Sequence, residues 1–268
     1  FFDALWQRAS IQVRIIGPAG NALIFATYLA PYIFISIFLI VERIRFKFSK
    51  LQTILIAVCG AIITVGILLT QLRSSYLGIV LGVVVGAAGY FVTTHQSAQP
   101  RRSFKKIISV SAIVIACCVG VIVFVRVLHI GEGRLTFNAT SLATLKTRFI
   151  NWNIALHAIR EHPIFGVGWE NYRTVADKMF DPHLAQYSYY ETRIDKPHNA
   201  FLEVWVTLGT VGLMIYLALI GVVIATVWRL YKRGALTAAG CWSIVGFFVA
   251  YHAQNFFAFD TPQTVFTQ

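Results

Sequence analysis

The chain has 268 residues, of which 57% are hydrophobic and only 13% are charged, and its mean hydropathy is +0.68. A soluble domain of this length must expose far more polar surface, so the composition excludes one and indicates an integral membrane protein. The net charge of +12 lies in short blocks between apolar runs, which argues against nucleic acid as a partner.

Apolar runs recur along the chain at the length that crosses a bilayer. A helix rises about 1.5 Å per residue, so about 20 residues span the ~30 Å hydrocarbon core. Helices are the expected spanning unit because they satisfy their own backbone hydrogen bonds. We therefore predict an all-α integral membrane protein with about six transmembrane helices, near residues 22–41, 51–70, 75–93, 107–127, 200–227 and 235–257.

Three basic blocks, "ERIRFKFSK" (42–50), "PRRSFKK" (100–106) and "WRLYKRG" (228–234), occupy alternate connections between these runs. The positive-inside rule places them in the cytoplasm and the long segment 128–198 outside. This topology predicts three parts: four transmembrane helices over 1–127, a periplasmic loop over 128–198 and two transmembrane helices over 199–268. Because the chain begins with Phe and ends in "FDTPQTVFTQ", we expect it to be a fragment of a longer protein.

Arg73 follows the second predicted span, in "TQLRSSYLG", where almost no loop separates two apolar runs. A lone arginine at a helix end most simply extends to the lipid head groups. However, this turn is on the side where positive charge is not needed for topology. The hydroxyls of Ser74 and Ser75 beside it add donors for anionic oxygen, so we treat Arg73 and Ser74 as candidates for anion binding.

The segment "TSLATLKTRFINWNIALHAIREHP" (140–163) has the spacing of an amphipathic helix lying near the outer membrane surface. Thr140 or Ser141 could cap its start, and Pro163 should end it. Its predicted apolar face comprises Leu142, Leu145, Phe149, Trp152, Leu156 and Ile159. A glycine-rich turn, "FGVGWENY" (165–172), should follow.

Candidate functional residues lie on this helix and at the start of the fifth span. Arg148, one turn before Trp152, is one candidate. The simpler interpretation of a single arginine is that it belongs to a solvated or lipid-facing edge of the helix. His198, in "KPHNAF", precedes a helix start, where free N–H groups favour anionic ligands. The alternative is that this segment only caps the helix, with Asn199 as the cap.

Other polar residues are weaker candidates. His157 and Glu161 are one helical turn apart, but a third metal ligand is not evident, so an exposed polar face explains them better. We expect neither a metal nor a cofactor. Late in the last span, His252, Gln254 and Asn255 should face protein rather than lipid.

The order of these motifs resembles that of the O-antigen ligase and polymerase family, which transfers lipid-linked glycans in bacteria. The matching pieces are "GNALIFATYLAPYIF", "LRSSYLGIVLG", "RFINWNIALHAIREHPIFGVGWENY" and "HNAFLEVWVTLGTVGLMIYL", and they cover nearly the whole chain. The resemblance implies a GT-C-like helical fold with a large periplasmic loop. It also implies a metal-independent, inverting glycosyltransferase in the bacterial inner membrane.

In this family, a glycan passes from an undecaprenyl-pyrophosphate carrier to a lipid or glycan acceptor. Carried over residue by residue, the resemblance gives Arg73, Arg148 and His198 as catalytic residues. Lys196 and Asn199, beside His198, join Arg73, Ser74 and Arg148 as predicted substrate-binding residues. His198 could act as a base or hold phosphate, and the sequence does not separate these roles.

Several functions remain open at this point. Ligation onto lipid A core, polymerisation of repeat units and protein O-glycosylation share the donor and differ in the acceptor. A polysaccharide transporter or exporter component is a different class, but it should carry charges at mid-membrane depth, which these spans nearly lack. A truncated, inactive relative is the third alternative.

Overall fold

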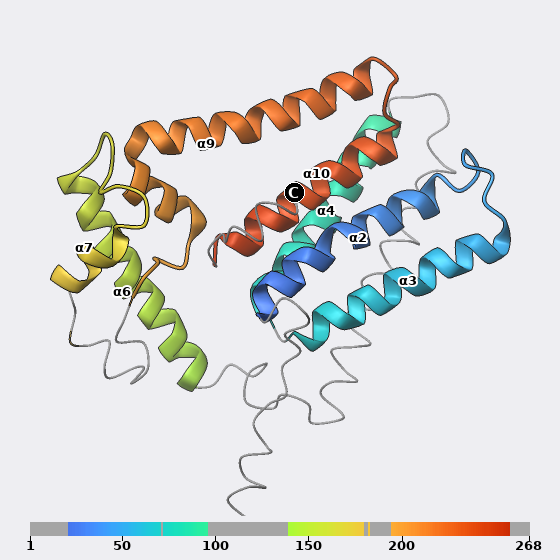
Figure 1. Cartoon of the computed structure of the whole chain (residues 1–268). Helices are drawn as coiled ribbons and strands as arrows, with labels where there is room; N and C mark the ends of the chain where they lie inside the picture. Colours follow the sequence, from blue (N-terminus) through green and yellow to red (C-terminus); the bar gives the residue numbers. More distant parts are fainter. Residues whose placement is uncertain (1–20, 71, 96–138, 180–181, 183–193, 258–268) are drawn as a thin grey trace, which may run out of the picture. The chain divides into compact units, whose positions relative to one another are not determined.

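The computed structural model describes residues 21–70, 72–95, 139–179, 182 and 194–257. Within these ranges all regular secondary structure is helical, which confirms the predicted all-α class (Figure 1). The helices are α2 (Ala22–Val41), α3 (Lys50–Leu69), α4 (Arg73–His95), α6 (Ala139–Glu161), α7 (Tyr172–Lys178), α9 (Ala200–Lys232) and α10 (Ala238–Asn255). The predicted span at 107–127 lies outside the described residues.

Four of these helices, α2, α3, α4 and α9, are long and apolar enough to cross a membrane. Helix α10 coincides with the sixth predicted span but is not among the four, because the polar residues of its last turn lower its hydropathy. Two of those residues, Gln254 and Asn255, are buried, as predicted for polar groups that face protein. The count of six spans stays a prediction.

Local sequence fixes where the first two helices begin. The Asn21 side chain accepts a hydrogen bond from the Leu23 N–H at the start of α2. Ser49 and Gln52 form a reciprocal capping box at the start of α3. Such caps satisfy N–H groups that the helix itself leaves unpaired, so each apolar run becomes helical directly after a polar residue.

The described residues fall into two compact units, and the first contains α2, α3, α4 and most of α10. Its core comprises Ala26, Ile33, Phe34, Ile67, Ile79, Val83 and Ala250. Glycines on one face of α4 let α10 approach closely: a Cβ at Gly82 would clash with the Gly246 carbonyl oxygen, and one at Gly89 with the Trp242 ring. Small residues at a helix interface are the usual means of close packing in membranes.

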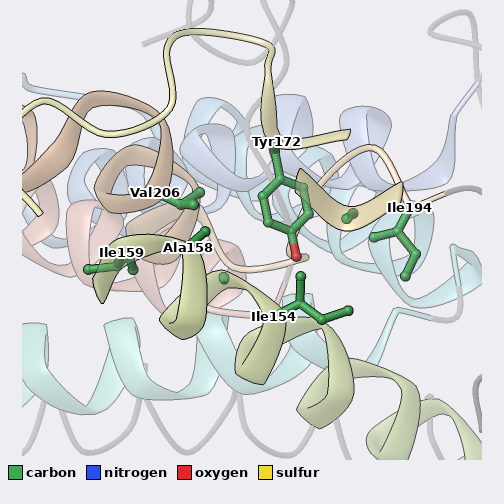
Figure 2. Close-up of a cluster of buried hydrophobic side chains, with 8 residues drawn as sticks. Ile154, Ala158, Ile159, Tyr172, Ile194 and Val206 are labelled. Carbon is green, nitrogen blue, oxygen red and sulfur yellow. The ribbon is translucent and has the colours of Figure 1, made fainter. Parts of the chain in front are cut away.

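The second unit contains α6, α7 and most of α9. Figure 2 shows its core, where the Tyr172 ring points toward α6, and Tyr172 donates a hydrogen bond of 2.9 Å to the Asn151 carbonyl oxygen. The core side chains are Ile154, Ala155, Ala158, Ile159, Tyr172, Ala176, Ile194 and Val206. Burial raises the pKa of the Tyr172 phenol, so it stays a neutral hydrogen-bond donor.

The predicted extent of the amphipathic helix is confirmed, and the face that packs against protein contains smaller side chains than the predicted apolar face. The helix begins at Ala139, one residue before Thr140, and ends at Glu161. Phe149 and Leu156 are exposed, whereas Ala155 and Ala158 are fully buried and Ile159 is buried as predicted. Small side chains bring α6 close to its neighbours, and a pattern based on large apolar residues misses this contact.

The fifth predicted span is not one uninterrupted helix. Gly209 has φ 69° and ψ −170°, which divides α9 into a short segment, Ala200–Leu208, and a long one, Thr210–Lys232. Only glycine adopts this backbone region readily. The predicted span at 200–227 lies within α9, which is long and apolar enough to cross a membrane, but the break at Gly209 was not predicted.

Candidate functional site

His198 lies in a sharp turn immediately before α9. Its φ is +55°, an unusual value for a residue with a side chain, and its imidazole is half-buried. Asn199 is buried, and its Oδ1 accepts hydrogen bonds from the N–H groups of Phe201 and Leu202 at 3.0 and 3.1 Å. The interpretation of Asn199 as the helix cap is therefore confirmed. The turn places His198 directly at the N-terminus of α9.

Lys196, two residues before His198, is held by acidic groups. Its Nζ lies 2.8 Å from Oε1 of Glu203 and 3.7 Å from Oε1 of Glu170. Partial burial lowers the pKa of Lys196, but the hydrogen bond and charge of Glu203, with the charges of Glu170 and Asp195, outweigh this and raise the pKa overall. Lys196 is therefore cationic at neutral pH, with its charge balanced inside the protein.

The turn after α6 is joined to the break in α9 by backbone hydrogen bonds. Around the break, Val167 N and Gly168 N donate to the carbonyl oxygens of Val206 and Thr207, each at 2.9 Å. In the other direction, Thr210 N donates to Pro163 O at 2.9 Å, and Val211 N donates to Ile164 O at 3.3 Å. The turn therefore satisfies the carbonyls that end one helical segment and the N–H groups that begin the next. We call this arrangement, residues 163–168 with 206–211, the clasp.

Glycine is required on both sides of the clasp. Gly166 has φ +69°, and a Cβ there would lie 2.5 Å from the Val206 carbonyl oxygen. A Cβ at Gly209 would clash with the Ile164 carbonyl oxygen. Two backbones thus approach more closely than a side chain allows, and the break in α9 is held against the turn that follows α6.

Arg148 lies on α6 beside a cluster of aromatic rings. Its guanidinium carbon is 5.9 Å from the centroid of the Phe257 ring, a cation–π contact, and Trp152 packs against Phe256 and Phe257. Phe201 links the cluster to both segments of α9, because its ring contacts Phe256 and Tyr216. The cluster comprises Trp152, Phe201, Tyr216, Phe256 and Phe257.

Two buried polar atoms belong to residues that follow Arg148 by three and four positions on α6. Asn151 Oδ1 and the Trp152 indole N–H have no hydrogen-bond partner within the described ranges. Residues three and four positions after Arg148 share its side of the helix. Buried polar atoms without partners are costly, so this face of α6 is suited to a polar ligand.

Arg73 lies in the other unit, as the first residue of α4, and its side chain is exposed. Ser74 is half-buried, whereas Ser75 is buried with 1% of its surface exposed. Of the two serines, Ser74 is therefore the one whose hydroxyl a ligand can reach. A positive charge in the first turn is unfavourable, because the N-terminal end of a helix is itself positive. Helix stability therefore does not explain why an arginine begins α4.

The second unit brings most of the predicted site residues onto elements that pack together. Arg148 is on α6, and Lys196, His198 and Asn199 form the turn into α9, while α6 and α9 share the core around Val206. Arg73 and Ser74 belong to the first unit. Three features were not predicted from the sequence: the clasp, the Glu203 partner of Lys196, and the rings of Phe256 and Phe257. The one available signal was "TLGTVG" (207–212), where glycines interrupt an apolar run.

The weaker polar candidates of the loop segment lie at the surface. His157 and Glu161 are both exposed on α6, and Asp177 pairs with Arg173 at 3.7 Å in an exposed contact. No group of three His, Cys, Asp or Glu side chains that could hold a metal ion occurs in the part of the chain that the structure describes.

The long apolar helices and this loop-borne polar site define a multi-pass helical membrane protein. A family model described as O-antigen ligase matches residues 58–217, more than half of the chain, and this stretch contains Arg73, Arg148 and His198. The chain therefore belongs to the O-antigen ligase family, and it falls within a group that acts on lipid-linked glycans. Comparisons with curated proteins and with solved structures give no significant match.

Proposed function

We propose that this chain carries the catalytic site of a glycosyltransferase that moves a glycan from an undecaprenyl-pyrophosphate carrier to an acceptor, lipid A core, at the periplasmic face of the inner membrane. The observation that carries the proposal is the clasp. It joins the turn that follows α6, the helix with Arg148, to the break in α9, the helix that His198 precedes, inside the segment that matches the family model.

Arginine suits the chemistry of this donor. A glycosyl pyrophosphate is already activated, so catalysis requires mainly stabilisation of the negative charge that grows on the departing pyrophosphate. Guanidinium groups bind phosphate oxygens bidentately and keep their charge, and each such donor contributes about 3 kcal/mol in a partly dry site. We assign this role to Arg73, with Ser74, and to Arg148. No divalent cation is needed for it.

The Phe257 ring and the Trp152 indole refine the role of Arg148. A cation held against an aromatic face is partly desolvated, which strengthens its interaction with phosphate. The Trp152 N–H adds a neutral donor one helical turn away. These contacts favour Arg148 as a positioned phosphate ligand over a residue that merely faces solvent.

We assign proton transfer to His198. A neutral imidazole at the start of α9 can accept the proton of the acceptor hydroxyl as the sugar–phosphate bond breaks. Attack from the face opposite the pyrophosphate then inverts the anomeric centre. A positioned base contributes roughly 10²- to 10⁴-fold to the rate.

The test is transfer from a defined lipid-pyrophosphate glycan by the full-length protein in proteoliposomes. We expect Arg73→Ala, Arg148→Ala and His198→Ala each to lower kcat by about 100-fold or more, while membrane insertion is unchanged. Arg160→Ala and His157→Ala are the matched controls, because both residues are exposed on α6, and they should retain activity.

Retained transfer in all three site variants would contradict the assignment. Lipid A core, a second lipid-linked glycan and a protein acceptor, offered separately, distinguish ligase from polymerase and from protein O-oligosaccharyltransferase. Movement of solute across the vesicles without consumption of donor would instead indicate a transporter.

A further inference from the structure

Three large apolar side chains of the turn after α6 are exposed on the structure. Ile164, Phe165 and Trp169 have 58%, 75% and 63% of their surface accessible. They lie within six residues in a turn whose backbone is fixed by the clasp. A rigid turn with three exposed apolar side chains marks an interaction surface.

The clasp gives the membrane depth of this turn. Ile164 O accepts a hydrogen bond from Val211 N, and Pro163 O accepts one from Thr210 N, so the turn lies beside the first residues of the long segment of α9. Trp169 follows Gly168, whose N–H donates to Thr207 O just before the break. Phe165 therefore lies at the depth of the first residues of the long segment. Trp169 lies at the depth of the residues just before the break.

The long segment has the length of one membrane crossing. From Thr210 to Lys232 it extends about 34 Å at ~1.5 Å per residue, against a hydrocarbon core of ~30 Å. Arg229 and Lys232 mark the boundary at one end. Thr210 and Val211 must then lie at the opposite boundary, and so must Ile164 and Phe165.

We propose that Ile164, Phe165 and Trp169 form a lipid anchor, inserted into the bilayer interface at which the long segment of α9 begins. The partner is bilayer lipid. The anchor continues the exposed apolar surface of α9, which includes Val211 and Met214. Tryptophan is favoured at this depth, and the exposed cations Arg160 and Arg173 flank the turn at the level of the head groups.

The experiment measures depth directly in the full chain. Cys59, Cys117, Cys118 and Cys241 are first replaced by Ser, and single nitroxide labels are then attached at Phe165→Cys or Trp169→Cys in phosphatidylethanolamine–phosphatidylglycerol vesicles. Val222→Cys, exposed in the middle of the long segment, is the deep reference. Lys178→Cys, exposed on α7, is the aqueous reference.

We expect the Phe165 label to collide mainly with oxygen, which dissolves in lipid, and to lie about 5–10 Å below the head groups. The Trp169 label should lie closer to the membrane surface than the Phe165 label. It should still be less accessible to a water-soluble reagent than the Lys178 label. A Phe165 label as accessible to a water-soluble nickel complex as the Lys178 label would overturn the anchor. So would a label shielded from both reagents, because protein would then cover the turn. Neither readout depends on glycan transfer.

Discussion

At the scale of single residues, the turn Lys196–Asn199 contains residues with a structural role next to the proposed catalytic histidine. Asn199 caps α9, and Lys196 is bonded to Glu203, so both support the backbone around His198. The positive field offered to a pyrophosphate therefore comes mainly from the arginines and from the start of α9. Substrate binding by Lys196 and Asn199 stays a prediction.

The Lys196–Glu203 pair is the first test at this scale. Both side chains are largely buried, with 16% and 13% exposed, so removing one partner leaves the other charge poorly compensated. We expect Lys196→Gln or Glu203→Gln to destabilise the fold by about 2 kcal/mol, and the double variant to cost less than the sum. Thermal unfolding in detergent measures this. Arg173→Gln, which removes an exposed pair, should cost below about 0.5 kcal/mol.

The pH dependence of this pair has a definite sign. The pKa of Lys196 is raised in the folded protein, so its contribution is fully present below the unfolded value and is lost as pH rises through the folded pKa. The stability difference between wild type and Lys196→Gln should stay constant from neutral pH to about pH 10 and shrink above it. A difference that already disappears between neutral and mildly alkaline pH would contradict the assigned pair.

At the scale of elements, the clasp is the feature that gives the site its geometry. A helix that broke at Gly209 without partners would leave carbonyl and N–H groups unpaired, at a cost of about 1–3 kcal/mol each. The turn after α6 supplies all four partners described above. The same contacts hold the lipid anchor at its depth, so one backbone arrangement positions both His198 and the turn.

A series of glycine substitutions isolates the clasp. Gly209→Ala adds both positive-φ strain and a clash with Ile164 O, and we expect it to cost on the order of 3 kcal/mol and most of the transfer activity. Gly234→Ala adds a positive φ of +74° with no atom near the new Cβ, and Gly221→Ala adds neither. Both should cost far less, as measured by thermal unfolding and by turnover. Equal effects across the series would show that the clasp has no special role.

The sequence predicts these elements better than their interruptions. Long apolar runs place α2, α3 and α4 to within two residues, because hydropathy alone sets a span. The break at Gly209 depends on partners about 45 residues earlier in the chain, and no local pattern contains them. The buried face of α6 was missed for a related reason, since Ala155 and Ala158 owe their burial to close approach rather than to size.

In the candidate site, too, local features could be predicted from the sequence and long-range contacts could not. Pro197, His198 and Asn199 stand at a boundary between polar and apolar sequence, so a helix start with a histidine beside it could be predicted. The rings around Arg148 could not, because Phe256 and Phe257 come more than 100 residues later. Chemical type is visible in a sequence, whereas long-range neighbours are not.

At the scale of the whole molecule, the predicted catalytic residues belong to two compact units. Arg73 begins α4 in the first, and Arg148 and His198 belong to the second. The chain belongs to the O-antigen ligase family and has the helices of a multi-pass membrane protein. Joint action of the three side chains on one pyrophosphate is the central claim.

The most direct measurement of that claim is cross-linking between the two arginine positions in the cysteine-free background. Ser74→Cys places a thiol next to Arg73, and Leu145→Cys places one three positions before Arg148, on the same side of α6. Both arginines stay intact. We predict that an impermeant thiol reagent labels both from the periplasmic side, that a short bis-maleimide joins them, and that the lipid-pyrophosphate glycan protects them. Labelling from opposite sides of the membrane, or no cross-link at any reagent length, would contradict a shared pyrophosphate site.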